Sequence, residues 1–559
     1  MTKKRRVTYL VIILALAAFL RLWQLNIYPP GLYSDEAMNG SNALEAIKNT
    51  KFLAGGESAF GGKLFYPENN GREGLFINIQ AISVSVFGNK PWALRGVSAI
   101  FGILTVLGLY LLVKELFKNE RLALFSAFLL ATSFWHLMFS RIGFRAIMAP
   151  FFMVWSFYFL WLAIGRKFDF SSFRLAVGSL ASLKIKAGEE KSNFLPKVYA
   201  AIAGVIFGLG FHSYIAYRAM PVLLIFPFYI LWKNKQKKII AVFILASFIA
   251  VLPLLLYFLK NPQDFLGRTS QISVFSSVSP IKALATNTLK TVGMFFTRGD
   301  ENWRHNFAGA PELWWPVSLL FLLGIAVGIK NLFKNAKNIF LEGFLFLWLI
   351  LALAPVIISN EGLPHALRAI IAIPPVMIFV ALGLEKIVQG VENWLKKKTI
   401  TYPDSARQLS RIKKEMTILL FAFLATLAIY TYSQYFLRWA TKAETYNAFN
   451  GHYADIAKYL NTLPNSTEKY VIVNANGVLA KNIPMPAQTI MFLTDTYVLK
   501  DRGEKKITYL LPEKIGLIKC ESACVVVTME MDSNLRNNIK QIIPALKLNI
   551  GTDIEYLKN

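Results

Sequence analysis

The sequence predicts a mainly α-helical, polytopic membrane protein with a small α/β domain after its last membrane span. Of its 559 residues, 55% are hydrophobic and only 17% are charged, and the mean hydropathy is +0.43. A soluble globular chain carries about 25% charged residues. Apolar runs long enough to cross a bilayer recur up to about residue 440, and shorter β-branched runs follow them. The composition therefore excludes a disordered chain, a coiled coil and an ordinary soluble enzyme.

Eleven apolar stretches predict eleven membrane-spanning helices, because a span needs about 20 apolar residues. The first, residues 7–25, follows the basic run Lys3–Arg6, and no small-residue cleavage site comes after it. We therefore expect an uncleaved first span with its basic end in the cytoplasm. The other ten predicted spans are residues 93–113, 121–139, 147–164, 198–216, 219–232, 239–259, 313–330, 338–358, 368–388 and 417–437.

The distribution of Lys and Arg predicts the orientation in the membrane. Residues 75–87 form an apolar stretch of about 13 residues, which is too short to span, so we expect an interfacial helix there. The basic segments then all fall on one side, which the positive-inside rule identifies as the cytoplasm. These segments are residues 2–6, 114–121, 165–197, 233–238, 330–337 and 386–415. The net charge of +28 thus reflects mostly topology, and we expect no nucleic-acid partner.

The chain outside the spans divides into a membrane module, residues 1–438, and an extracytoplasmic α/β domain, residues 440–559. The module's first outer loop covers residues 26–92. In the tail, short apolar runs predict strands, with helical stretches at its start and at residues 534–546. The predicted strands are residues 470–473, 489–493, 507–511 and 524–528. Cys520 and Cys524 could form a disulfide in this compartment or remain free thiols.

Polar residues gather in six clusters at the predicted outer ends of the spans. Helix capping, or anchoring of long side chains at the membrane surface, would explain each cluster taken singly. Six clusters on one face favour a shared site. The candidate residues are Asp35 and Glu36, Arg72 and Glu73, Arg141 and Arg145, His212 and Arg218, Arg304 and His305, and His365 and Arg368.

The residue types in these clusters indicate a chemistry. Asp35 could cap the helix that follows it or act as a general base on an acceptor hydroxyl or amine. Guanidinium groups match the geometry of phosphate oxygens. A phosphate leaving group needs no general acid, so a base and a set of cations would suffice for its displacement.

Several motifs occur in an order that carries a family resemblance. Pro-Pro-Gly-Leu-Tyr-Ser-Asp-Glu-Ala occupies residues 29–37, and Gly-Arg-Glu-Gly-Leu at residues 71–75 precedes a stretch that ends in Phe87-Gly88. Ala-Leu-Arg follows at residues 93–95, and Ala-Thr-Ser-Phe-Trp-His at residues 131–136 leads into Ser140-Arg141. Over residues 7–390 the chain resembles the lipid-linked-sugar-dependent glycosyltransferases of the GT-C fold, in the protein mannosyltransferase and aminoarabinose transferase superfamily.

The resemblance implies an integral membrane enzyme of the plasma membrane. Such an enzyme transfers a sugar, with inversion, from a polyprenyl-phosphate donor to a protein, lipid or glycan acceptor on the outer face. The resemblance places Asp35 at the catalytic centre and implies that arginines and other polar groups bind the phosphate of the donor. In some relatives a Glu at the position of Glu73 helps to bind a divalent metal ion.

One departure concerns a second acid. Many relatives carry a further Asp where this chain has Arg145-Ala146, so its role either passes to Glu36 or disappears. The alternative functions are a flippase for lipid-linked sugars and a secondary transporter. Both would place ionisable residues in mid-span, and the predicted spans hold few of them.

Overall fold

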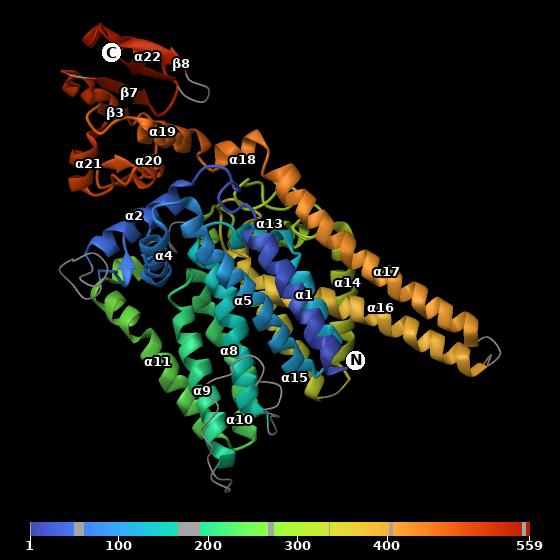
Figure 1. The fold of residues 1–559 in the computed structure, drawn as a ribbon. Coiled ribbons are helices and arrows are strands. Elements are labelled where there is room, and N and C mark those ends of the chain that lie inside the picture. The colour runs from blue at the N-terminus through green and yellow to red at the C-terminus, as the bar shows by residue number, and fades with distance from the viewer. Residues whose placement is uncertain are drawn as a thin grey trace.

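The computed structural model describes residues 2–49, 61–165, 191–265, 273–334, 336–401, 406–521, 523–550 and 555–558. A large bundle of apolar helices forms most of the molecule, and a smaller unit with a β-sheet lies at one end of it (Figure 1). The protein is therefore a mainly helical, multi-pass membrane protein, as the sequence predicts.

Each predicted span coincides with a helix or with two consecutive helical segments. Within the described ranges, eight helices are long and apolar enough to cross a membrane, or nine if the bent pair α6 and α7 forms one span. In this pair the axis bends by 60°. Two predicted spans fall outside that count, since α1 carries the charges of Lys3–Arg6 and Arg21, and the apolar part of α9 covers only Phe194–Gly210.

The bundle elements follow the predicted spans in order. They are α1 (Lys3–Leu22), α5 (Pro91–Phe117), α6 (Glu120–Ala131) with α7 (Phe134–Ser140), η1 (Arg145–Ile147) with α8 (Met148–Ile164), α9 (Lys191–Gly210), η3 (Ile215–Leu224) with α10 (Ile225–Lys233), α11 (Lys237–Lys260), α14 (Trp315–Leu332), α15 (Ala336–Ile357), η5 (Ile370–Ala372) with α16 (Ile373–Thr401), and α17 (Ala406–Tyr432) with η7 (Ser433–Trp439).

In its described residues, 26–49 and 61–92, the first outer loop contains two short helices, α2 (Ser34–Lys48) and α4 (Gly74–Phe87), which pack against each other. The predicted interfacial stretch 75–87 is thus a helix of 14 residues, too short to span. A two-stranded ribbon, β1 (Phe65–Tyr66) and β2 (Arg72–Glu73), joins them. With α13 (Pro280–Gly293), these elements lie at the end of the bundle that faces the sheet-containing unit (Figure 1).

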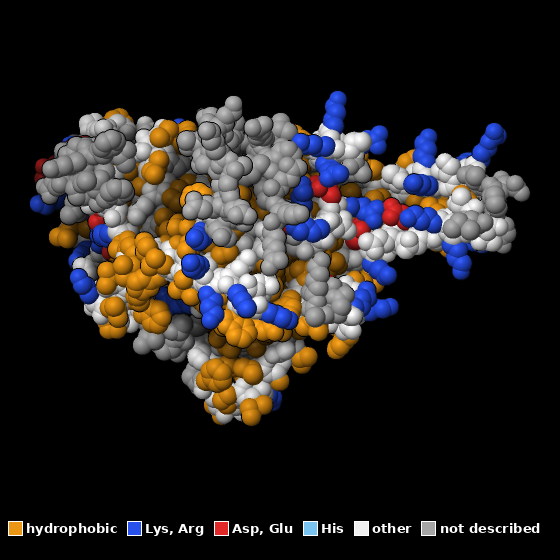
Figure 2. Space-filling model, turned by 90° about the horizontal axis from the view of Figure 1, so that it is seen from below, with side chains coloured by type: hydrophobic (Ala, Val, Ile, Leu, Met, Phe, Trp, Pro, Cys, Tyr) orange, Lys and Arg blue, Asp and Glu red, His pale blue; other side chains and the backbone are white. Residues whose placement is uncertain are grey.

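The opposite end of the bundle is rich in basic side chains. Seen from that end, Lys and Arg side chains surround apolar helix ends and line the protruding hairpin of α16 and α17 (Figure 2). Exposed members include Lys235, Lys396, Lys397, Arg411 and Lys413. All five belong to segments that the sequence predicts to be cytoplasmic.

The C-terminal unit contains a five-stranded sheet in the order β6-β3-β7-β9-β8. The strands are β3 (Glu468–Ile472), β6 (Ile507–Leu510), β7 (Cys524–Thr528), β8 (Lys547–Ile550) and β9 (Glu555–Lys558). Strands β6, β3 and β7 are parallel, whereas β9 pairs antiparallel with β7 and β8. The accompanying helices are α18 (Ala443–Ala448), α19 (Gly451–Thr462), α20 (Gln488–Leu493), α21 (Leu499–Lys505) and α22 (Ser533–Ile542). The predicted α/β character is confirmed.

One predicted strand is wrong. Residues 489–493 form helix α20, which a 3₁₀ turn (Met485–Ala487) introduces directly after Pro484. A short apolar run cannot be assigned to strand or helix by its periodicity alone. Helices α2 and α19 pack on α20, and Ile490 and Met491 also share a hydrophobic cluster with Val471 of β3.

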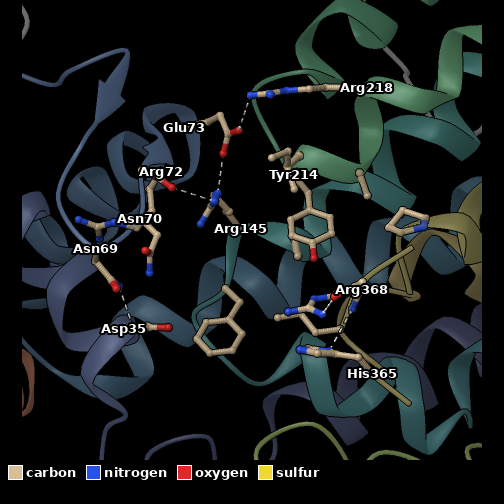
Figure 3. Close-up of a pocket in the computed structure, with 18 of the residues that line it drawn as sticks. Asp35, Asn69, Asn70, Arg72, Glu73, Arg145, Tyr214, Arg218, His365 and Arg368 are labelled. Carbon is tan, nitrogen blue, oxygen red and sulfur yellow. Dashed lines mark hydrogen bonds and ion pairs between the residues drawn. The ribbon is translucent and has the colours of Figure 1, made fainter. Parts of the chain in front are cut away.

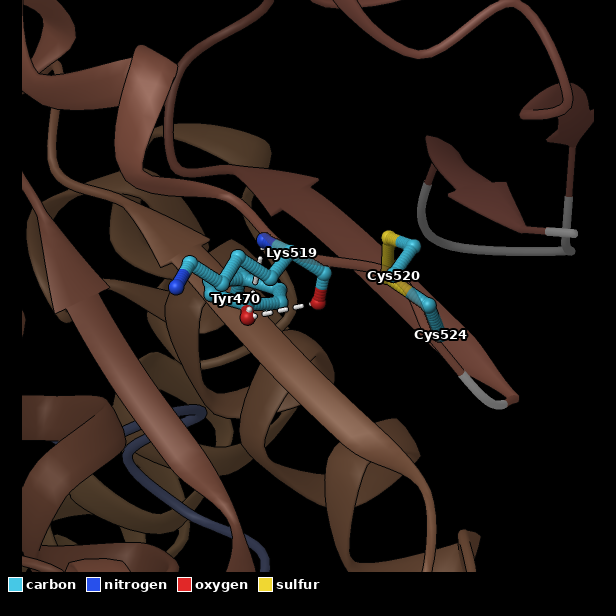
Figure 4. Close-up of a disulfide and its surroundings, with 4 residues drawn as sticks. All are labelled: Tyr470, Lys519, Cys520 and Cys524. Atoms are coloured by element: carbon cyan, nitrogen blue, oxygen red, sulfur yellow. Dashed lines mark hydrogen bonds between the residues drawn. A yellow bond between two sulfur atoms is a disulfide. The ribbon is translucent and has the colours of Figure 1, made fainter.

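The two cysteines form a disulfide at the start of β7 (Figure 4). Cys524 is fully buried. Close to this bond, the Tyr470 hydroxyl donates to the Lys519 carbonyl at 2.8 Å and accepts from the Lys519 amide at 3.1 Å. The bond and this pair of hydrogen bonds fix the turn that leads into β7.

The C-terminal unit is docked on the beginning of α2. Phe492 of α20 is buried in a cluster with Leu32 and Ala37. Asn450 donates to the Ser34 hydroxyl at 2.7 Å. Gly31, with a φ of +69°, lies so close that an added Cβ would come within 2.5 Å of the Phe449 carbonyl oxygen. The unit therefore holds the chain immediately before Asp35 in place.

Candidate active site

A cavity of about 380 Å³ opens where the outer loops meet the ends of the helices. Seven of the twelve predicted site residues line it: Asp35, Arg72, Glu73, Arg145, Arg218, His365 and Arg368. They come from α2, the ribbon before α4, η1, η3 and the loop after α15, and their side chains converge in Figure 3. The sequence thus predicts a common site, and the fold brings these seven residues together.

Asp35 lies in the first turn of α2 and faces the cavity. The N-cap of this helix is Tyr33, and the backbone N–H of Tyr33 donates to Glu36. Asp35 is thus not the cap, and its carboxylate Oδ1 accepts a hydrogen bond from Asn69 Nδ2 at 2.8 Å. The positive end of the helix dipole stabilises a carboxylate at this position. Asp35 is an oriented, half-buried anion that a ligand in the cavity can reach.

The residue that orients Asp35 belongs to a left-handed turn. Asn69, Asn70 and Gly71 have φ values of 54°, 62° and 76°. Asn and Gly are the residues that adopt this conformation at least cost. Asn69 lines the cavity but is absent from the predicted site residues, although the Asn-Asn-Gly sequence already signals such a turn.

A buried glutamate is shared by two arginines on one wall of the cavity. Arg145 Nε lies 2.7 Å from Glu73 Oε2, and Arg218 Nη2 lies 4.0 Å from Glu73 Oε1. Each arginine side chain remains 21% exposed, whereas Glu73 is 3% exposed. Two guanidinium groups with one counter-ion leave positive charge facing the cavity. The same arrangement disfavours a metal cation at Glu73, since both neighbours would repel it.

Arg368 lies on the opposite wall. Its guanidinium donates to the Glu361 carbonyl oxygen at 2.7 Å, to the Glu361 carboxylate at 3.0 Å and to the Ser359 hydroxyl. Glu361 itself is largely exposed. Arg368 therefore faces the cavity from a position that its own loop fixes.

Arg72 lines the cavity but is engaged in the protein interior. Its side chain donates to Asn39 at 2.6 Å and to Asn42 at 2.7 Å, both on α2. Burial, reinforced by the positive charge of Arg145, lowers the pKa of Arg72 to about 10. These bonds connect the ribbon that carries Glu73 to α2, the helix that carries Asp35.

Glu36 does not reach the cavity. It is fully buried and accepts from Arg95 Nε at 2.9 Å and from the Gly143 amide at 2.7 Å. An ion pair with this geometry holds α2 against α5 and the loop before η1. Glu36 is therefore not placed to act as the second catalytic acid that the sequence left open for it.

Arg141 and His212 also lie outside the cavity lining. The Arg141 guanidinium is buried and donates to the carbonyl oxygens of Leu20 and Tyr28, each at 3.0 Å. His212 is buried, with Nε2 3.1 Å from the Ala250 carbonyl oxygen of α11. Both side chains therefore satisfy backbone groups within the bundle.

Arg304 and His305 belong to a loop that lies behind the cavity. Arg304 stacks on the ring of Tyr33 at 3.9 Å, and so supports the first turn of α2.

His305 contacts a buried carboxylate in the same loop. His305 Nδ1 lies 3.0 Å from Asp300 Oδ2, and Asp300 also accepts from the Ala366 amide at 2.8 Å. Burial opposes ionisation of Asp300, but the hydrogen bond and charge of His305 lower the pKa of Asp300 below its ordinary value. Asp300 is a second residue absent from the predicted site.

Comparisons with known proteins find one matching family model and several solved structures with a similar fold. A family model described as dolichyl-phosphate-mannose-protein mannosyltransferase matches residues 75–187. ArnT from Cupriavidus metallidurans bound to undecaprenyl phosphate superposes with a TM-score of 0.56 at 13% identity, covering 100% of this chain and 98% of that chain. The apo state of that ArnT gives a TM-score of 0.53 at 12% identity, with coverage of 99% and 98%.

An archaeal protein has the same architecture. The apo oligosaccharyltransferase of Archaeoglobus fulgidus superposes with a TM-score of 0.52 at 16% identity, covering 88% of this chain and 64% of that chain. No curated protein matches the chain by sequence. ArnT and the oligosaccharyltransferase are both GT-C glycosyltransferases. The predicted GT-C fold is confirmed.

Proposed function

We propose that this chain is an integral membrane glycosyltransferase that takes a sugar from a polyprenyl-phosphate donor and transfers it, with inversion, to an acceptor on the extracytoplasmic face. One observation carries the proposal. In a GT-C fold, the carboxylate of Asp35 and the guanidinium groups of Arg145, Arg218 and Arg368 line one cavity. The bound undecaprenyl phosphate of the similar ArnT structure supports a donor of this class.

The arginines suit the departing phosphate. As the bond from the sugar to the phosphate breaks, negative charge grows on the leaving oxygens, and cations already aimed at them lower the barrier. Arg145 and Arg218 share Glu73 and are partly exposed, so an incoming phosphate gains two donors without leaving a buried cation unpaired. Arg368 adds a third donor from the other wall.

Asp35 suits the incoming acceptor. A carboxylate accepts the proton of a hydroxyl or amine as this group attacks the anomeric carbon, and the leaving phosphate needs no proton. The hydrogen bond from Asn69 fixes one oxygen of Asp35, which leaves the other oxygen free to act. Attack on the face opposite the phosphate inverts the anomeric centre. The acceptor is a protein, a lipid or a glycan.

The test compares turnover and donor binding on one preparation. Membranes that contain the protein are supplied with radiolabelled polyprenyl-phosphate sugars, and transfer is followed for the wild type, Asp35→Asn and Arg145→Ala. Asp35→Asn should lower turnover by about 10²–10⁴ and leave donor affinity nearly unchanged, because the general base is lost. Arg145→Ala should weaken donor binding by about 1.5–3 kcal/mol, the value of a hydrogen bond to a charged group.

The matched control is Asp455→Asn on α19, whose carboxylate accepts from Tyr446 and does not line the cavity. It should transfer at the wild-type rate. Near-normal turnover of Asp35→Asn would show that Asp35 is not the base. Movement of the labelled donor across the bilayer without transfer to any acceptor would support a flippase or transporter instead.

A further inference from the structure

Asp300, His305 and His365 bring three metal-ligating side chains together beside the cavity. Their ligand atoms all lie within 4.8 Å of one another. Among the described residues, this is the one group of three or more His, Cys, Asp or Glu side chains whose ligand atoms lie this close together. Asp300 and His305 come from the loop after α13, and His365 comes from the loop after α15. The cluster therefore joins two loops that are far apart in the sequence.

The distances within the cluster fit a small cation. Asp300 Oδ2 lies 3.0 Å from His305 Nδ1 and 3.7 Å from His365 Nδ1. Ligand atoms around a tetrahedral zinc ion, with bonds of about 2.0–2.1 Å, lie about 3.3–3.4 Å apart. The two imidazole rings are neighbours, with centroids 4.8 Å apart and planes inclined by 31°. The three ligand atoms lie within 4.8 Å of one another, so a move of the side chains toward a common centre would let all three groups bind one ion.

The carboxylate is oriented as metal-binding carboxylates usually are. The Ala366 amide donates to Asp300 Oδ2 at 2.8 Å, and the Asn302 amide donates to Oδ1 at 2.8 Å. Such hydrogen bonds fix a ligand before the metal arrives. Asp300 and His305 are buried, so water competes poorly for these positions.

We infer that Asp300, His305 and His365 bind a single divalent transition-metal ion, for which Zn²⁺ is the best match. Two imidazoles and one carboxylate are a ligand set that zinc accepts, with a fourth position left for water or a ligand. His365 lines the cavity, so this fourth position lies at the cavity wall (Figure 3). The site is separate from Glu73, which two arginines neutralise, and it stands whether or not the chain transfers sugars.

The experiment measures metal binding by the full chain in detergent, purified with an affinity tag that contains no histidine. After treatment with a chelator and its removal, Zn²⁺ is titrated against a competing indicator, and Co²⁺ is added in parallel for its visible absorption. We expect one tight Zn²⁺ per chain, a tetrahedral Co²⁺ spectrum and a higher melting temperature with Zn²⁺.

The variants are His305→Gln and His365→Gln, with His452→Gln on α19 as the matched control outside the cluster. Each cluster variant should bind Zn²⁺ at least about tenfold more weakly and lose the cobalt spectrum, since one of three ligands is gone. The control should behave as the wild type. His365 is partly exposed at the cavity wall, so its variant serves if His305→Gln fails to fold. Equal zinc affinity in the wild type and both cluster variants, or no binding by the wild type, would overturn the inference.

Discussion

Asp35 and Glu36 are adjacent acids with different surroundings. Successive residues of a helix point about 100° apart, so Asp35 faces the cavity while Glu36 turns toward Arg95. The Glu36 and Arg95 side chains are 0% and 1% exposed. A buried carboxylate with this many partners holds elements together, whereas a carboxylate with one oxygen free can react.

We predict that the main effect of Glu36→Gln is a loss of protein stability and not a loss of catalytic turnover. The substitution leaves the Arg95 guanidinium buried without its counter-charge, which costs about 3–5 kcal/mol. Thermal unfolding in detergent measures the loss. Glu415→Gln is the matched control, because Glu415 is 55% exposed and pairs with the exposed Arg411, so it should cost under about 1 kcal/mol. Lost turnover at unchanged melting temperature would instead give Glu36 a part in the chemistry.

The sequence predicts which residues gather at the site better than it predicts which of them are accessible. Arg145 and Arg141 are four positions apart in one motif, yet Arg145 faces the cavity and Arg141 satisfies two backbone carbonyl groups. An arginine carries the same side chain in both roles. The tertiary contacts of each arginine decide which role it has, and a sequence pattern does not reveal these contacts.

At the scale of elements, α2 is held from both sides. Arg72 bonds it to the ribbon before α4, and Phe492 of α20 packs on its other face. An added Cβ at Gly40 would lie 2.5 Å from the Phe492 ring, which shows how close this contact is. The position of Asp35 therefore depends on a residue of the C-terminal unit.

We predict that Phe492→Ala lowers both the melting temperature and the transfer rate. Truncation of a fully buried Phe typically costs about 3–5 kcal/mol, and the cavity that remains would loosen the first turns of α2. Both quantities are measured on one preparation. Leu517→Ala is the control, since Leu517 is 62% exposed on the same unit and should change stability by at most about 0.5 kcal/mol. An unchanged transfer rate would separate the C-terminal unit from the active site.

The elements most readily predicted are those whose length is set by the bilayer. The spans and the short helix α4 follow from the number of apolar residues alone. In the C-terminal unit the length of an apolar run does not separate helix from strand, because α20 and the strands have apolar runs of similar length. Strands β8 and β9, absent from the predicted elements, carry polar and charged side chains such as Lys547 and Lys558.

At the scale of the whole molecule, α2 and α4 lie with the C-terminal unit at one end of the bundle (Figure 1), and the basic hairpin of α16 and α17 protrudes near the other end (Figure 2). The cavity belongs to the first of these ends, because α2 and the ribbon before α4 contribute to its lining. The positive-inside rule then predicts that the cavity opens on the extracytoplasmic side.

Cysteine labelling in sealed cells tests this orientation. Asn476→Cys, exposed after β3, should react with an impermeant maleimide added outside, and Lys235→Cys, between α10 and α11, should react only after permeabilisation. The native cysteines are bonded to each other and should stay unreactive without reductant. The reverse pattern of labelling would invert the predicted topology.

The walls of the cavity come from segments that leave the ribosome at very different times. Asp35 and the turn at Asn69 are synthesised first, His365 and Arg368 emerge only after α15, and Phe492 follows later still. A chain that ends before α15 therefore lacks the wall that His365 and Arg368 form, and a chain that ends before α20 lacks the contact of Phe492 with α2. We expect activity to appear only after the C-terminal unit has been synthesised and has docked on α2, so the catalytic carboxylate would be set in place by the last part of the chain to be made.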